Sequence, residues 1–440
     1  MAGVQCFAVM PGDTHTAEPP SDRPRDDRVA LFAGLAVGGA ALFLLCGYEL
    51  VRSVSASLYI EAYEAKRLPI VMALGPVGTL VLLYGYGWLL SLAGARRTMV
   101  ISSLVAGLGL IACYLGLLGG SRLATAVLYV LREAYIVILI EQYWSFINST
   151  LTKAQASRLN GPICGLGSVG AVSGSYLVGL TAQRIGSQGM VLLAAVFLIP
   201  AALMMLLAYR LGGEPAPSAA EPRATRGKLG LAMFRDYHIL RYLAVLIVLT
   251  QVVATVLELR FNQIVEVARP LTDERSSYFG YFYGQLNFLA FILQFIGAPL
   301  VLRVLPVLAV HALIPAIHLL AGVLLLLRPS LTVAAVAYLL FKAFDYSLFR
   351  AAKELFYLPL PFDARYRAKE VIDAFGYRAA KGSAAGLLAL AGKFVGTLPG
   401  VAYPAIALGA ETLWLMTIGA IRANPPHPHH PRSIDQSSTG

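Results

Sequence analysis

The sequence predicts an all-α integral membrane protein with twelve transmembrane helices in two six-helix pseudo-repeats. Of its 440 residues, 58% are hydrophobic and only 13% are charged, and the mean hydropathy is +0.68. Soluble globular chains carry about 25% charged residues. Apolar stretches of about twenty residues, each long enough to cross a hydrocarbon core of about 30 Å, recur between positions 29 and 421. The chain is therefore expected to cross the bilayer repeatedly rather than to bind its surface.

Six spans are predicted in the first half, separated by Gly, Pro and charged residues. They cover residues 29–58, 68–91, 98–119, 122–147, 160–185 and 188–209, which together form a predicted N-terminal six-helix bundle, 29–209. The fifth span has glycines every four or five residues, and this spacing predicts close packing against a neighbouring helix. These glycines are Gly161, Gly165, Gly170, Gly174 and Gly179.

A linker and six further spans make up the second half. Residues 210–236 mix Pro, Gly and Arg and are predicted to be a cytoplasmic linker. The spans that follow cover 237–265, 276–299, 302–327, 331–358, 369–396 and 400–421, forming a C-terminal bundle, 237–421. The polar segments 1–28 and 422–440 lack the apolar length of a span and are predicted to be disordered cytoplasmic termini.

The distribution of basic residues predicts the orientation. With the N-terminus in the cytoplasm, the cytoplasmic segments hold more Lys and Arg than the opposite side, as the positive-inside rule requires. We therefore expect a multi-pass protein of the inner (plasma) membrane with both termini inside. The formal net charge of +11 is spread through loops and spans instead of forming one patch, so no nucleic-acid partner is expected.

Fifteen ionisable residues fall inside the predicted spans, where each would cost ~2.5–3.5 kcal/mol or more if it faced lipid. They must therefore line a hydrated path or pair with one another. Pairing within one helix is possible at spacings of three or four residues, as for Glu49 with Arg52, Lys342 with Asp345, and Arg350 with Glu354. The set comprises Glu49, Arg52, Arg132, Glu133, Glu141, Glu258, Arg260, Lys342, Asp345, Arg350, Lys353, Glu354, Asp373, Arg378 and Lys381.

Positive side chains from several helices can converge on one polyanion, since Arg offers a planar fork to phosphate oxygens and Lys a compact charge. Lys353, Arg378 and Lys381 are the best candidates for phosphate contact. The alternative interpretation of the same charges is a structural network of ion pairs that controls the opening and closing between the two halves. Its predicted members are Glu49, Arg132, Asp345, Arg350, Glu354 and Asp373.

The two halves share a spacing that indicates a repeat. Glu141 precedes Asn160 by 19 residues, and Glu354 precedes Asp373 by the same interval. In each case an acid near a helix end leads through a basic loop into the next span. Two parallel six-helix repeats around a midplane site are the plan of major-facilitator-type transporters.

The stretch from Asp345 to Ser383 resembles the ATP/ADP translocase (nucleotide transporter) family of plastids and intracellular bacteria. A weaker resemblance extends over most of the membrane region. The resemblance implies exchange of nucleotides, and its charged positions carry over to Glu141, Glu258 with Arg260, and Lys353. The matching motif residues are Tyr346 to Phe349, Lys353, Glu354, Tyr357 to Leu360, Lys369, Ile372, Asp373, Gly376, Arg378 and Lys381.

The first span departs from this family. Where the family has Arg-Ser-Leu-Lys-Asp-Thr-Leu, this chain has Arg52 to Leu58, with Ser55 and Ala56 in place of the Lys and Asp. Either Arg52 and Arg350 supply the missing charge or the substrate differs. The alternatives to nucleotide exchange are therefore transport of another organic anion and a membrane scaffold that transports nothing.

No catalytic or metal-binding constellation is apparent. His238, His311 and His318 have no Ser/Asp or Cys partners in the pattern of an active site, so each is expected at a helix interface, and no enzyme activity is expected. The four cysteines lack metal-ligand spacing, and no disulfide, metal or cofactor is expected. The expected partners are a small anion and the lipid bilayer, with the chain acting as a monomer.

Overall fold

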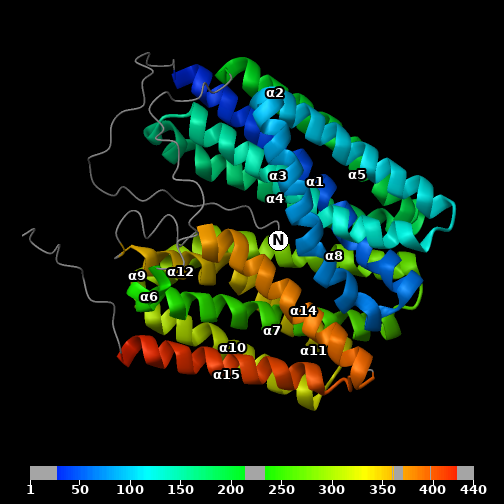
Figure 1. Ribbon diagram of the computed structural model, residues 1–440, viewed down its shortest axis with the longest axis vertical. Helices are drawn as coiled ribbons and strands as arrows, with labels where there is room; N and C mark the ends of the chain where they lie inside the picture. The colour runs from blue at the N-terminus through cyan, green and yellow to red at the C-terminus, as the bar shows by residue number, and fades with distance from the viewer. Residues whose placement is uncertain (1–26, 214–232, 359, 361–369, 397, 424–440) are drawn as a thin grey trace, which may run out of the picture.

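A computed structural model describes residues 27–213, 233–358, 360, 370–396 and 398–423 (Figure 1). The predicted termini 1–28 and 422–440 and the linker 210–236 lie wholly or mostly outside these residues, and so does Lys369 of the translocase-like motif. Every regular element in the described part of the chain is helical.

The first half contains five α-helices and one short 3₁₀ turn. Helix α2 has 51 residues, or about 75 Å of helix, which is enough for two spans. Gly94, with φ of 76°, breaks its helical backbone between the predicted spans 68–91 and 98–119. The elements are α1 (Asp27–Tyr63), η1 (Ala65–Arg67), α2 (Leu68–Leu118), α3 (Arg122–Thr150), α4 (Lys153–Ile185) and α5 (Ser187–Gly212).

The second half adds three π-helical segments to its α-helices. The bounds of the first part are α6 (Met233–Asp236), α7 (His238–Ala268), α8 (Thr272–Ile292), η2 (Leu293–Gly297), α9 (Ala298–Val304) and α10 (Val307–Leu327). They continue with α11 (Leu331–Phe344), η3 (Asp345–Phe349), α12 (Arg350–Tyr357), η4 (Glu370–Gly376), α14 (Tyr377–Phe394) and α15 (Ala402–Ala423). Short π segments inside α-helices are frequent at functional sites.

The predicted all-α membrane fold is confirmed. Among the described residues, ten helical stretches are long and apolar enough to cross a bilayer. The prediction of twelve spans differs for two reasons. Helix α2 accounts for two predicted spans at once, and α14 is absent from the ten, carrying Arg378, Lys381 and Lys393 within its 18 residues.

Large apolar side chains cover the outside of the helices, as expected of a surface that meets lipid. Tyr84 is 83% exposed, and Val81 and Leu108 of the same helix are each 65% exposed. Inside, one apolar core joins α1 to α5, and a second joins α7 to α15 together with the end of α1, the start of α2 and Tyr129 of α3. Figure 1 shows the corresponding two groups of helices, blue to green above and green to red below. The boundaries of the two bundles remain a prediction.

Helix α4 packs against α1 and α8 through glycines. A Cβ added at Gly170 would lie 2.1 Å from the carbonyl oxygen of Leu42, and one at Gly174 would lie 2.3 Å from that of Cys46. A Cβ added at Gly179 would lie 3.0 Å from the ring of Tyr281. The predicted close packing is therefore confirmed at these three positions. It is wrong at Gly161 and Gly165, where a Cβ would meet nothing within 4 Å.

Hydrogen bonds join the two halves at the end where α1, α4 and α7 finish. The backbone N–H of Ala65 donates to Glu266 at 3.1 Å. Ser187, at the start of α5, donates to Asp273 of α8 through its N–H at 2.7 Å and its hydroxyl at 2.6 Å. The hydroxyl of Ser277 donates to the carbonyl oxygen of Gly179 at 2.6 Å. These contacts close that end of the molecule.

The cysteines differ from expectation at one position. Cys46 and Cys113 are free and buried. Cys164 is disulfide-bonded. The expectation of no disulfide is therefore wrong, because spacing along the sequence does not reveal which cysteines the fold brings together.

Candidate functional site

A cavity between the two halves gathers most of the ionisable side chains found inside the spans. It is bounded by α1 and α3 from the first half and by α7, α8, α11, η3, α12 and α14 from the second. Five side chains are cationic, three are carboxylates and five are tyrosines. The lining residues are Tyr48, Arg52, Arg132, Glu133, Gln251, Glu258, Tyr283, Tyr338, Lys342, Asp345, Tyr346, Arg350, Tyr377 and Lys381.

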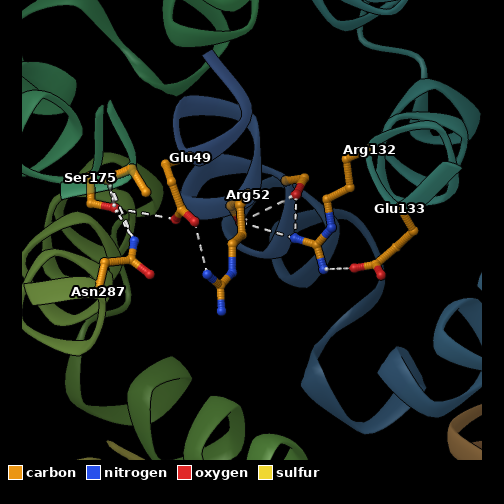
Figure 2. Close-up of polar contacts among 8 residues, drawn as sticks. Glu49, Arg52, Arg132, Glu133, Ser175 and Asn287 are labelled. Atoms are coloured by element: carbon orange, nitrogen blue, oxygen red, sulfur yellow. Dashed lines mark hydrogen bonds and ion pairs between the residues drawn. The ribbon is translucent and has the colours of Figure 1, made fainter. Parts of the chain in front are cut away.

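Arg52 reaches the cavity from α1 and touches both halves. Its Nη1 lies 2.9 Å from the Oε1 of Glu49, one turn away on the same helix, as the three-residue spacing predicts. Its guanidinium lies over the ring of Tyr283 at 3.9 Å. Glu49 also accepts a hydrogen bond from Ser175 at 3.2 Å, and Ser175 in turn contacts Asn287 (Figure 2). This network connects the cavity to the packing between α4 and α8.

Arg132 occupies the space beside the short residues of α1. Its Nη1 donates to the Oγ of Ser55 at 2.6 Å and to the carbonyl oxygen of Arg52 at 2.9 Å (Figure 2). Its Nη2 lies 3.4 Å from Glu133, and its guanidinium covers the ring of Tyr129 at 3.8 Å. Arg132 therefore brings a cation from α3 against Ser55 of α1.

On the opposite wall, charges from α7 and α14 pair across helices. The Nζ of Lys381 lies 3.5 Å from the Oε2 of Glu258, and both side chains are largely buried. Such a pair offsets the cost of placing two charges at membrane depth. A substrate anion could compete with Glu258 for Lys381, which would free the carboxylate.

The π segment η3 and the first residue of α12 contribute three polar side chains to the cavity lining. Asp345 and Tyr346 belong to it, and Arg350 follows directly in α12. One extra residue per turn in a π segment shifts the faces of the helix on either side of it. Asp345 is buried, and its Oδ1 has no hydrogen-bond partner among the described residues. Arg350 lies over the ring of Tyr346 at 5.4 Å.

Lys353 lies outside the lining of this cavity. Its Nζ contacts Asp373 of η4 and lies 3.9 Å from Glu354. The hydroxyl of Tyr357 reaches the same Asp373 oxygen at 3.5 Å. This residue of the translocase-like motif is therefore held by two carboxylates in this state. Contact between Lys353 and a substrate phosphate stays a prediction.

Three further candidates do not line this cavity. Arg378 lines a second cavity between α2, α3 and α14, which shares Glu133 and Lys381 with the first. Glu141 is exposed and lines neither cavity. Arg260 lies beside Gly400 at the start of the last helix and donates to Gln263 at 3.4 Å.

The cavity also contains residues that the sequence reading did not select as site residues. Glu133 and Lys342 were recognised only as charges within spans, and Gln251 gave no signal at all. None of the five tyrosines was selected as a site residue. Tyr346 was recognised only as part of the translocase-like motif, and the position of Tyr283 in its span fits an interfacial aromatic belt as well as it fits stacking on a base. Only the fold shows which of them face inward.

The same fold occurs in solved structures of transporters. A bacterial homologue of the iron transporter ferroportin, in an inward-facing state, has a TM-score of 0.65 and 14% identity over 89% of this chain and 98% of that one. A point mutant of the nucleoside transporter NupG has a TM-score of 0.62 and 12% identity over 89% of this chain and 99% of that one. The POT family transporter PepTSo has a TM-score of 0.62 and 12% identity over 91% of this chain and 99% of that one. No protein-family model and no curated protein matches the chain. These likenesses establish the major-facilitator-type fold.

Proposed function

Starting from an integral membrane protein of the major-facilitator type, we propose that the chain is a secondary transporter that exchanges nucleotides by alternating access. The two halves move relative to one another, and the charged cavity between them faces first one side of the membrane and then the other. No covalent chemistry is required. The proposal places the chain in the inner (plasma) membrane, with both termini in the cytoplasm.

The observation that carries the proposal is the charge of the cavity. Arg52, Arg132, Lys342, Arg350 and Lys381 outnumber the carboxylates Glu133, Glu258 and Asp345 by two. Both halves contribute cations. A polyanion such as a nucleoside diphosphate or triphosphate would balance the excess, and arginine forks suit phosphate oxygens.

The tyrosines of the cavity fit the other part of a nucleotide. Tyr283 already carries a guanidinium on its face, and Tyr338 stacks on Phe282 at a centroid distance of 5.6 Å. Aromatic side chains can pack against a flat base while their hydroxyls donate hydrogen bonds. A cavity with cations on several walls and tyrosines between them therefore matches a ligand with a charged end and a planar end.

The fold by itself does not choose the cargo, because similar folds serve many solutes. The similar structures include a nucleoside transporter, a peptide transporter and a D-xylose-proton symporter. A second candidate cargo is another organic anion. It is favoured by Ser55 and Ala56, which replace the charged pair of the resembling family in α1.

The test is exchange in proteoliposomes. Vesicles loaded with ADP are given labelled ATP, ADP, phosphate, succinate or xylose outside, and initial uptake is measured with and without internal ADP. We expect uptake of the nucleotides only, dependent on internal ADP. Lys381→Ala and Glu258→Ala should each lower it by about tenfold to hundredfold, the loss of one or two charge-assisted contacts.

The matched control is Lys393→Ala, which removes the same type of side chain from the exposed last turn of the same helix as Lys381. It should transport at the wild-type rate. Uptake of succinate but not of nucleotides would replace the first cargo by the second. Wild-type exchange in both cavity variants would contradict the assignment of the cavity.

A further inference from the structure

Outside the cavity, polar side chains are buried in apolar surroundings between α10 and α15. Glu411 of α15 is 1% exposed, and His318 of α10 is 2% exposed. A Cβ added at Gly322, one turn beyond His318, would lie 3.6 Å from the Oε2 of Glu411. The rings of His318 and Trp414 have centroids 6.3 Å apart. The two protonatable groups therefore lie in one buried layer of the second half.

These groups have no hydrogen-bond partner in the described part of the chain. The Oε2 of Glu411, both ring nitrogens of His318 and the Nε1 of Trp414 are all buried without a hydrogen bond. Burying an ionised carboxylate in apolar surroundings without a counter-charge costs far more than burying the neutral acid. Glu411 is therefore expected to hold a proton in this state.

No cation on the neighbouring helices, in the part of the chain that the structure describes, replaces that proton. Helix α15 packs mainly against α7 and α10. On α7, Glu258 is paired with Lys381, and Arg260 lies against Gly400, eleven residues before Glu411 in the chain. The remaining cation of α7, Arg241, contacts His238 in the first turn of that helix. On α10 the titratable groups are His311 and His318.

A proton fits this site better than a metal ion. A metal would need several ligands, and the described residues contain no group of three or more His, Cys, Asp or Glu side chains that could hold one. A proton needs a single carboxyl group. Acids and histidines buried within membrane helices commonly mark proton pathways.

The layer touches the helix that forms the cavity. The ring of His318 contacts Phe341 and Phe344 at the end of α11. Trp414 contacts Phe349, the last residue of η3, with centroids 5.2 Å apart. Segment η3 carries Asp345 and Tyr346 into the cavity. Binding or loss of a proton behind η3 can therefore change the packing of the cavity wall through adjoining rings.

We propose that Glu411, with His318 in the same buried layer, is a proton-binding site that couples proton movement to transport by this chain. The inference rests on the proposed function and adds to it. The carboxylate takes one proton from the water on one side of the membrane and releases it on the other side as the halves change their arrangement. Such coupling gives net anion uptake driven by a pH gradient in addition to exchange.

The test compares two assays in the same proteoliposomes. The first is exchange of labelled ADP for internal ADP without a pH gradient. The second is net accumulation of labelled ADP in vesicles without internal nucleotide and with an alkaline interior. For one proton per cycle, a gradient of one pH unit should raise accumulation about tenfold. Glu411→Gln should keep the exchange and lose the response to the gradient.

Thr412→Val is the matched control, since Thr412 is exposed on the same helix and its hydroxyl bonds back to Leu408 at 2.8 Å. It should keep both activities. A gradient response retained by Glu411→Gln overturns the inference, and so does a wild-type protein that exchanges ADP without any response. Absence of exchange in the wild type contradicts the proposed function itself.

A variant that loses both activities calls for a measurement on the wild type alone. When ADP is added outside vesicles that contain a pH-sensitive dye, protons should enter with it and the interior should become more acidic. An unchanged dye signal during ADP uptake overturns the inference without depending on the folding of any variant.

Discussion

At the scale of single residues, the sequence identified charges but only some of their partners. The pair Glu49 and Arg52 follows from a spacing of three residues on one helix. Lys381 with Glu258 and Lys353 with Asp373 connect different helices, for which no spacing rule exists. The contact of Arg132 with Ser55 could not be predicted from the sequence either, because it depends on how α3 approaches α1.

The pair of Glu258 and Lys381 predicts a pattern of stabilities. Either Glu258→Gln or Lys381→Gln leaves the other charge buried without its partner, which costs up to about 3–5 kcal/mol. The double variant should recover much of that loss because no uncompensated charge remains. Thermal unfolding of the four proteins in detergent measures the coupling between the two positions.

The exposed pair of Glu64 and Lys66 supplies the control for this cycle. Replacing either member by Gln should leave the unfolding temperature almost unchanged, because water screens charges at the surface. Additive losses at Glu258 and Lys381 would show that the two side chains do not stabilise each other in the folded protein.

At the scale of helices, most spans could be predicted because a bilayer demands a fixed apolar length. The π segments could not, since a local change of hydrogen bonding leaves no mark on hydropathy. This matters at η3, which places Asp345 and Tyr346 in the cavity. The glycine repeat in α4 was read correctly as a packing surface, but the sequence could not show where the contact with α1 begins.

Two glycines of α4 allow this contact to be tested by one methyl group each. In Gly174→Ala the new Cβ would lie 2.3 Å from the carbonyl oxygen of Cys46, and a backbone atom cannot move without shifting the helix. We expect a loss of about 1–3 kcal/mol in the free energy of unfolding, as for other overpacked interiors. Chemical or thermal unfolding in detergent measures it.

Gly165→Ala is the matched change on the same helix, where the methyl group meets nothing within 4 Å. It should be neutral or slightly stabilising, since Ala favours helix more than Gly does. Equal destabilisation by both substitutions would mean that the effect does not come from the contact between α1 and α4.

At the scale of the whole molecule, a repeat predicted from two acid spacings agrees with a fold whose cavity draws on both halves. The sequence did not show which end of the cavity is closed, because that depends on contacts between residues far apart in the chain. Ser187 contacts Asp273 and Ser276 across the halves at the closed end. Alternating access requires these contacts to separate in every cycle.

Locking this end should therefore stop transport. The hydroxyl oxygens of Ser187 and Ser276 are 2.7 Å apart, so Ser187→Cys combined with Ser276→Cys places two thiols within reach of a disulfide. Oxidation should reduce ADP exchange to background because the closed end can no longer open, and a reducing agent should restore it. Each single cysteine variant should transport equally well under both conditions. Full exchange by a protein shown to be cross-linked would mean that the two halves need not separate here, and alternating access through this end would have to be abandoned.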